Sequence, residues 1–213
     1  MLKIKTFIFN PFQENTYVVS DETGSCVIID PGCSSDRENE DVESYIEQHN
    51  LDPVKVLCTH LHADHVLGNA FFYEKYGLKP EAHFNEQDLY NMVKSQVQMF
   101  GLIMHSEPPE IGNYLNEGDM VSFGNTTFKV LLVPGHSPGG ICFYSEKDKV
   151  VFAGDCLFSG SIGRTDLWGG DHQLLLNRIK SELLTLPEET VVYSGHGPTT
   201  TIGEEKKDNP FLS

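Results

Sequence analysis

The sequence predicts an α/β (α+β) protein, a sandwich of two mixed β-sheets flanked by helices. Short runs with the two-residue alternation of strands are interleaved with longer segments of helical periodicity. Several strand-like runs are joined by turns of only a few residues, which favours antiparallel hairpins. The 213 residues are 39% hydrophobic, which is enough for a sizeable core. Because both kinds of connection occur, each sheet is expected to be mixed.

Nine segments show the alternation or the apolar content of strands. In chain order they are Leu2–Phe9, Thr16–Val19, Cys26–Ile29, Val54–Cys58, Met120–Phe123, Thr126–Val133, Ile141–Tyr144, Val150–Ala153 and Val191–Tyr193. Gly124-Asn125 is typical of a hairpin turn between two of them, and residues 145–149 predict another.

Four segments show helical periodicity, and most carry end signals. They are Asp36–Gln48, Asp64–Tyr76, Asn85–Phe100 and His172–Leu186. Gly77 and Gly101 follow the second and third segments as C-terminal caps. Asp171 predicts the N-cap of the last helix, and Pro187 its end.

Composition and charge narrow the class of protein. Lys and Arg number 15 against 31 Asp and Glu, so the formal net charge is −16, which argues against a nucleic-acid partner. No apolar run approaches the ~20 residues of a membrane span, and the start is too short for a secretory signal peptide. Five cysteines without a CxxC pair predict a reducing, cytoplasmic setting. We expect one domain over residues 1–213, with no separate C-terminal helical domain.

Polar groups follow four strand-like runs at the point where each run ends. His60, His136, Asp155 and His196 each stand just past an apolar strand, and glycine precedes three of them. Reactive groups collect beyond the carboxyl ends of strands in α/β proteins, because loops there stand on a rigid base. The four side chains are therefore expected to meet at one edge.

The densest of these strand ends is Thr59-His60-Leu61-His62-Ala63-Asp64-His65. His60 and His62, two apart in extended chain, point to the same side. Asp64 and His65 are expected on the first turn of the helix that follows. Three neighbouring imidazoles would repel one another if protonated and have little value as core, so the cluster predicts a bound cation.

The candidate ligands are too many for one tetrahedral zinc. They are His60, His62, Asp64, His65, His136, Asp155 and His196. Seven ligands fit two divalent ions roughly 3.5–4 Å apart that share one carboxylate. Histidine and carboxylate without thiolate favour zinc first, with iron or manganese as alternatives. Cys156, next to Asp155, points the other way from an extended strand end and is expected to be structural.

The motif THLHADH, followed by GH, GD and GH in this order, resembles the metallo-β-lactamase superfamily. Ile28-Ile29-Asp30-Pro31-Gly32 is similar to the early strand end of that superfamily. Within it, residues 134–140 (PGHSPGG) and the tail around Asn209-Pro210-Phe211 resemble glyoxalase II, the hydroxyacylglutathione hydrolase.

The resemblance implies a four-layer αββα fold with the site along one edge of the sandwich. It assigns His60, His62 and His136 to a first metal. Asp64, His65 and His196 fall to a second metal, and Asp155 bridges the two. Asp30 is expected to orient a ligand histidine from behind, with a simple turn residue as the alternative.

Thioester hydrolysis suits such a site. Two divalent ions turn a bridging water into hydroxide near neutral pH, and we expect this hydroxide, with Asp64 and Asp155, to form the catalytic group. An alkyl thiolate, whose conjugate acid has a pKa near 8.5, leaves without a strong general acid. The expected substrate is a small anionic thioester, S-acylglutathione or a similar molecule. Arg164 is the candidate carboxylate clamp, and Trp168 a candidate pocket wall.

Two alternatives remain open at the level of sequence. Persulfide dioxygenases share the implied fold and a Gly-Arg-Thr-Asp run like residues 163–166, and use one iron, which His60, His136 and Asp155 would hold. A non-catalytic metal-binding protein is the second alternative. His196 is followed by Gly197-Pro198, where glyoxalase II usually has a nearby Tyr, so the thiol part of the substrate is left open. The oligomeric state, and whether residues 101–112 form a lid near the site, are also open.

Overall fold

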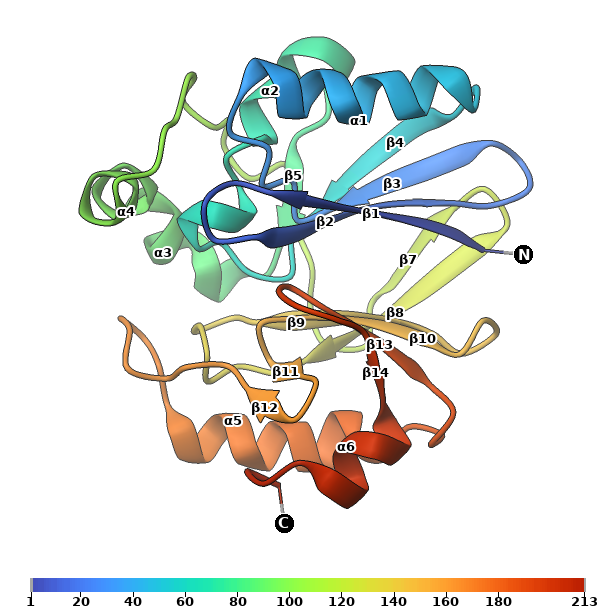
Figure 1. Cartoon of the computed structure of the whole chain (residues 1–213), viewed down its shortest axis with the longest axis vertical. Helices are drawn as coiled ribbons and strands as arrows, with labels where there is room; N and C mark the ends of the chain where they lie inside the picture. The colour runs from blue at the N-terminus through green and yellow to red at the C-terminus, as the bar shows by residue number, and fades with distance from the viewer. Residues whose placement is uncertain (1, 213) are drawn as a thin grey trace.

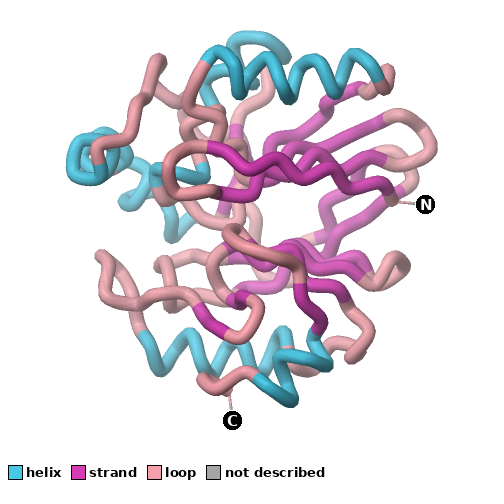
Figure 2. The backbone as a smooth tube through the Cα atoms, in the orientation of Figure 1, coloured by secondary structure: helices cyan, strands magenta, loops and turns pink. Residues whose placement is uncertain are grey.

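The computed structural model describes residues 2–212 and has four layers, helices, sheet, sheet and helices, as the sequence predicts. Figure 1 shows α1 and α2 on one side of the sandwich and α5 and α6 on the other. Figure 2 shows the strands gathered between these helical layers. The predicted sandwich of two mixed sheets is therefore confirmed.

The first sheet has six strands in the order β1-β2-β3-β4-β5-β6. They are β1 (Lys3–Phe9), β2 (Glu14–Ser20), β3 (Ser25–Ile29), β4 (Asp52–Leu57), β5 (Pro80–Ala82) and β6 (Asn113–Tyr114). The first two pairings are antiparallel and the other three are parallel. The sheet is mixed because β1–β3 are joined by hairpins, whereas helices connect β3 to β4 and β4 to β5.

The second sheet also has six strands, in the order β14-β13-β10-β9-β8-β7. They are β7 (Met120–Phe123), β8 (Thr126–Leu132), β9 (Ile141–Ser145), β10 (Val150–Gly154), β13 (Val191–Ser194) and β14 (Thr200–Thr201). Only β10 and β13 pair in parallel, across the helical segment that separates them. A separate short hairpin consists of β11 (Leu157–Phe158) and β12 (Ser161–Ile162).

The helices cover the outer faces of the sandwich and the end near the candidate site. They are α1 (Asp36–Gln48), α2 (Asn69–Tyr76), α3 (Gln87–Asn91), α4 (Val93–Phe100), α5 (His172–Arg178) and α6 (Ile202–Asp208). Residues 2–212 also form three short helical turns: the 3₁₀ turns η1 (Ala63–His65) and η2 (Phe84–Glu86), and the π-helical η3 (Ile179–Leu183). Among residues 2–212, each helix is too short or too polar to span a lipid bilayer.

Three clusters of buried apolar side chains lie between the four layers of helices and sheets. The side chains of strand β3 alternate between two of these clusters. Cys26 and Ile28 pack under α1 and α2, whereas Val27 and Ile29 pack between the sheets. The third cluster lies under α5 and η3, where Leu175 is fully buried.

Two predicted helices begin or end differently in the structure. The segment 64–76 starts with η1, and α2 begins only at Asn69. Adjacent α-helical positions point about 100° apart, whereas Asp64 and His65 turn toward the same cluster. The segment 85–100 divides into η2, α3 and α4, with a break between α3 and α4. The side chain of Gln96 in α4 spans this break: its Nε2 donates to Leu89 O of α3, and its Oε1 accepts from Ala63 N.

The last predicted helix continues as η3 beyond Arg178. Most predicted end signals are confirmed: Asp171 accepts from Leu174 N at 2.9 Å, and Gly77 and Gly101 adopt the left-handed conformation. All five cysteines are unpaired and buried. Cys156 donates to Val133 O at 3.2 Å and belongs to none of the candidate metal-binding groups.

Candidate metal centre

Strand ends deliver every residue of the predicted cluster to one edge of the sandwich. The segment 60–65 follows β4 of the first sheet, while His136, Asp155 and His196 follow β8, β10 and β13 of the second. Strands β10 and β13 run in parallel, so Asp155 and His196 leave the sheet side by side. The centre therefore draws on both sheets.

Three compact groups occur among the described residues, and the one of Asp30, His60 and His65 overlaps the other two. The first group joins His60, His62 and His136, each offering one ring nitrogen within 4.8 Å of the others. All three are buried. His136 Nε2 lies 2.9 Å from His62 Nδ1. Such closely facing ring nitrogens are the arrangement expected around a shared cation.

The second group joins Asp64, His65 and His196 under the same distance limit. His196 Nε2 lies 3.3 Å from Asp64 Oδ2 and 3.3 Å from His65 Nε2. His65 is fully buried, whereas His196 is half-buried at the pocket side.

Asp155 lies between the two groups. Its Oδ2 is 3.6 Å from His136 Nε2 and 3.6 Å from His196 Nε2. Its Oδ1 is 3.5 Å from His65 Nε2. One carboxylate thus faces both groups at once, as a bridging ligand must.

Backbone carbonyls behind two histidines fix which ring nitrogen points inward. His136 Nδ1 lies 2.7 Å from Arg164 O, and His196 Nδ1 lies 3.0 Å from Phe12 O. A carbonyl only accepts, so each Nδ1 must carry the proton, which leaves the Nε2 lone pair facing the cluster. Outer hydrogen bonds of this kind orient metal-binding histidines.

Buried polar atoms without a hydrogen-bond partner indicate that the donor set fits metal ions. His60 Nε2, His62 Nε2 and Asp155 Oδ1 are buried and have no hydrogen-bond partner among the described residues. Buried polar atoms of native proteins are nearly always paired, so these unpaired atoms require another partner. A cation beside Asp155 would satisfy His60 Nε2 and Asp155 Oδ1, whereas His62 turns its other nitrogen, Nδ1, toward His136 and the cluster.

Burial and neighbouring charges set the protonation of the histidines. Burial, reinforced by His136, lowers the pKa of His62 to about 3, and burial lowers the pKa of His60 well below its usual value. Both rings are therefore neutral, with a lone pair free near pH 7. Burial also acts to lower the pKa of His65, but the carboxylates of Asp64 and Asp155 raise it overall.

Asp30 lies directly behind the second group. Its carboxylate accepts from Thr59 N at 2.7 Å and from Thr59 Oγ1 at 2.6 Å, and Oδ2 lies 3.3 Å from His65 Nδ1. The contact with His65 is the one predicted for this residue. Thr59 Oγ1 in turn lies 3.0 Å from His60 Nδ1, so Asp30 reaches both groups.

Sequence reasoning missed two buried glutamates around the cluster. Glu86 accepts from Leu61 N at 2.9 Å and from Gly139 N at 2.6 Å, and so ties the loop of His60 and His62 to the loop of His136. Glu14 lies with Oε1 unpaired, 3.9 Å from His65 Nδ1. Only the tertiary structure brings these residues to the centre, because neither belongs to a local motif.

A pocket of about 340 Å³ opens onto both groups. Its walls include Phe12, Phe100 and Leu167 beside the clustered side chains, and Arg164 lies at the same pocket. Arg164 makes two hydrogen bonds to Asp166, at 2.7 and 2.8 Å. Trp168 is half exposed and lines the neighbouring groove rather than this pocket.

The segment 101–112 does not cover the described pocket. Ile103, His105 and Ser106 instead line a separate cavity of about 180 Å³ beside α1 and α2. Among the described residues, only the helix end at Phe100 reaches the metal pocket from this side.

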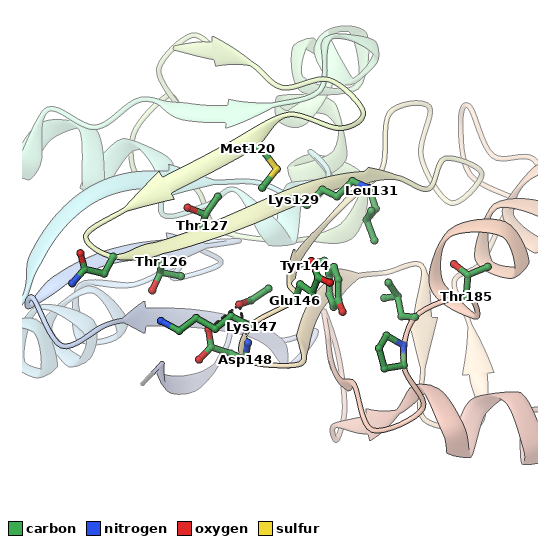
Figure 3. A pocket seen from close by; sticks show the side chains of 14 residues that line it. Met120, Thr126, Thr127, Lys129, Leu131, Tyr144, Glu146, Lys147, Asp148 and Thr185 are labelled. Atoms are coloured by element: carbon green, nitrogen blue, oxygen red, sulfur yellow. Dashed lines mark hydrogen bonds between the residues drawn. The ribbon is translucent and has the colours of Figure 1, made fainter.

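A larger cavity, of about 700 Å³, lies on the second sheet (Figure 3). Thr127 and Lys129 of β8 line it, whereas Phe128 between them packs in the core between the sheets. Its described lining shares no residue with the metal pocket and contains no histidine. The clustered ligands, not cavity size, therefore mark the functional site.

The αββα fold and the two His/Asp groups at its edge together define a class, that of metal-binding αββα proteins. Within this class, the chain belongs to the metallo-beta-lactamase superfamily, whose model matches residues 9–196. The chain is 36% identical to the hydroxyacylglutathione hydrolase GloC of Haemophilus influenzae over 220 residues, which cover 100% of this chain and 99% of that protein.

Solved structures agree with this assignment. The crystal structure of BLEG-1 B3 metallo-beta-lactamase has a TM-score of 0.88 at 36% identity and covers 99% of this chain and 100% of that chain. The structure of TTHA1623 in a di-iron-bound form has a TM-score of 0.87 at 40% identity, covering 98% and 100%.

Proposed function

We propose that this protein is a metal-dependent hydrolase that cleaves small acyl thioesters. The observation that carries the proposal is the pair of three-residue groups with Asp155 between them, open to one pocket. Membership of the superfamily and the similarity to GloC support it.

In this proposal each side chain of the cluster has a defined part. His60, His62 and His136 would hold one cation, Asp64, His65 and His196 would hold a second, and Asp155 would serve both. When bound, such ions lower the pKa of water from 15.7 to about 7 and polarise a carbonyl oxygen. The donor set favours zinc, while iron or manganese also fit it.

The protein's own residues keep this donor set ready. The carbonyls of Arg164 and Phe12 hold the protons of His136 and His196 on the outer nitrogens. Asp30 supports His65 from behind, and neutral His60 and His62 keep their lone pairs. The site therefore needs little rearrangement to bind a cation.

The pocket favours a leaving group that departs unaided. Among its described lining residues, every acid or histidine belongs to one of the two groups or is Asp155, and the remaining charged residue is Arg164. No spare proton donor is thus at hand for a poor leaving group. A thiolate needs none, because the pKa of its conjugate acid is near 8.5. An amine or alkoxide does need one.

Arg164 is the proposed contact for a negative charge on the substrate. Arg164 lines the pocket, and Asp166 holds its guanidinium with two hydrogen bonds. A substrate carboxylate would share this guanidinium with Asp166, so we expect Arg164 to affect KM more than kcat.

Hydrolysis assays on protein of measured metal content test the proposal. The panel contains S-lactoylglutathione, acyl thioesters of N-acetylcysteamine, a β-lactam, and glutathione persulfide with oxygen uptake as the readout. We expect thiol release from a thioester, and at least about a 100-fold loss in His62→Ala, since a metal supplies several kcal/mol of transition-state stabilisation. His105→Ala is the matched control, because His105 lies outside the pocket.

The other outcomes would each replace the proposal. One iron per chain together with oxygen uptake would establish the dioxygenase reaction. Cleavage of the β-lactam alone would assign the chain to the reaction for which BLEG-1 is named. Bound metal without turnover of any substrate in the panel would favour a non-catalytic protein.

A further inference from the structure

An apolar groove of about 260 Å³ runs from the metal pocket along α4. Met92, Met99 and Phe100 form one wall, and Leu167 and Trp168 form the other. Met99 and Trp168 are 76% and 51% exposed, which is unusual for such large apolar side chains. Two walls of exposed apolar surface that face each other indicate a binding groove.

The groove is continuous with the candidate metal centre. His62, Phe100 and Leu167 line both cavities. His62 belongs to the first of the two ligand groups. A molecule whose reacting carbonyl lies at the metal pocket would therefore extend one arm into the groove.

The charge of the groove selects the kind of arm. The one charged residue among its described lining is Asp166, and this carboxylate accepts two hydrogen bonds from Arg164. No cation faces the groove to pair with a carboxylate of the substrate. Charged groups therefore gain no partner there, whereas an apolar chain loses its exposure to water.

We propose that this groove binds an apolar acyl arm of the thioester substrate, and so sets the acyl specificity of the site. The inference rests on the hydrolase function proposed above and names its substrate class. Met92 and Met99 suit this part, because unbranched thioether side chains adapt to flexible apolar ligands.

Trp168 allows the groove to be tested without any reaction. It is the single tryptophan of the chain, so its emission reports on this groove alone. The probes are two thioethers of N-acetylcysteamine that cannot be hydrolysed, S-hexyl and S-methyl. We expect the hexyl compound to shift the emission of Trp168 to shorter wavelength at concentrations where the methyl compound has no effect.

Kinetics test the same groove with the matched thioesters, S-hexanoyl- and S-acetyl-N-acetylcysteamine. We expect kcat/KM to favour the hexanoyl substrate by at least about tenfold, since one methylene in an apolar pocket is already worth about 10-fold or more. Met99→Glu places a charge in the groove and should reduce this preference about tenfold, mainly through KM. Gln98→Glu adds the same charge to an exposed position of α4 outside the groove, and should leave the preference intact.

The results separate this inference from the proposed function. A Trp168 shift with hexyl thioether, but no cleavage of any thioester, overturns the hydrolase and leaves the apolar groove. Cleavage without chain-length preference and without a Trp168 shift overturns the groove and leaves the hydrolase. A preference for S-hexyl thioacetate over the hexanoyl thioester would place the apolar arm on the thiol side and overturn the acyl assignment.

Discussion

At the scale of single residues, Asp30 combines an unusual backbone with an unusual set of contacts. Its φ of 49° lies in the left-handed region, which Asn tolerates as well as Asp does. Asp30→Asn therefore keeps the backbone but replaces one acceptor oxygen by an NH₂ group, next to two donors of Thr59 and the ring of His65. We expect metal affinity to fall about 10- to 100-fold with the fold retained.

Competition with a chelator followed by metal analysis measures this affinity, and circular dichroism checks the fold. Asp36→Asn, an exposed carboxylate at the start of α1, is the control and should bind metal like the unaltered protein. An unchanged affinity in Asp30→Asn would show that Asp30 does not support the second group.

The buried glutamates mark the limit of what single residues reveal in sequence. Asp30 could be predicted because it follows a strand end and belongs to a motif. Glu86 falls in a segment with helical periodicity, where a glutamate is ordinarily exposed. Its burial follows from two backbone donors, Leu61 N and Gly139 N, that lie 25 and 53 positions away. No local pattern contains such a contact.

At the scale of elements, Glu86 joins the loops that follow β4 and β8. Glu86→Gln leaves only one acceptor oxygen for two buried amide donors, so one N–H loses its partner. We expect unfolding free energy to fall by about 1–3 kcal/mol, with weaker metal binding by the first group. Urea unfolding measures the loss, and Glu40→Gln on the exposed side of α1 is the control. A loss no larger than that of the control would contradict this account.

Gly135 fixes how the loop of His136 passes α5. Its φ is +126°, and a Cβ there would meet Leu175 N at 2.5 Å and Asp171 O at 2.7 Å. Gly135→Ala should therefore cost clearly more than the roughly 1–2 kcal/mol of left-handed strain alone, and should displace His136. Gly160→Ala isolates the strain, because Gly160 has a φ of +69° with nothing within 4 Å. Thermal unfolding of the two variants compares them, and equal losses would exclude crowding as the cause.

Periodicity predicted elements well where one face meets one apolar layer. Residues 36–48 form α1 as predicted, since Val42 and Ile46 are buried and Tyr45 packs beside them against the first sheet. Periodicity failed after residue 63, where Asp64 and His65 serve the metal centre, and at the break between α3 and α4, which the Gln96 side chain spans by donating to Leu89 O. Functional and bridging contacts overrode helical propensity at these points.

At the scale of the whole molecule, the metal centre links the two sheets. The first sheet contributes the segment 60–65, and the second contributes His136, Asp155 and His196. Asn15 of β2, in the first sheet, adds to this link because its side chain donates hydrogen bonds to Ser194 O and Gly197 O, on either side of His196. A cation in either ligand group would therefore connect the two sheets, because each group takes residues from both of them.

Removal of metal should thus lower global stability rather than loosen one loop. A ligand that binds only the folded state stabilises by about 2.7 kcal/mol at 100 times its Kd. For a chain of this length that corresponds to a fall in Tm on the order of 5–10 °C after dialysis against chelator. The fall should be reversed by added zinc, and it should be much smaller in Asp155→Asn, because that variant loses the carboxylate between the groups. A chelated protein that unfolds at an unchanged Tm would mean that the two sheets do not depend on the metal centre for their association.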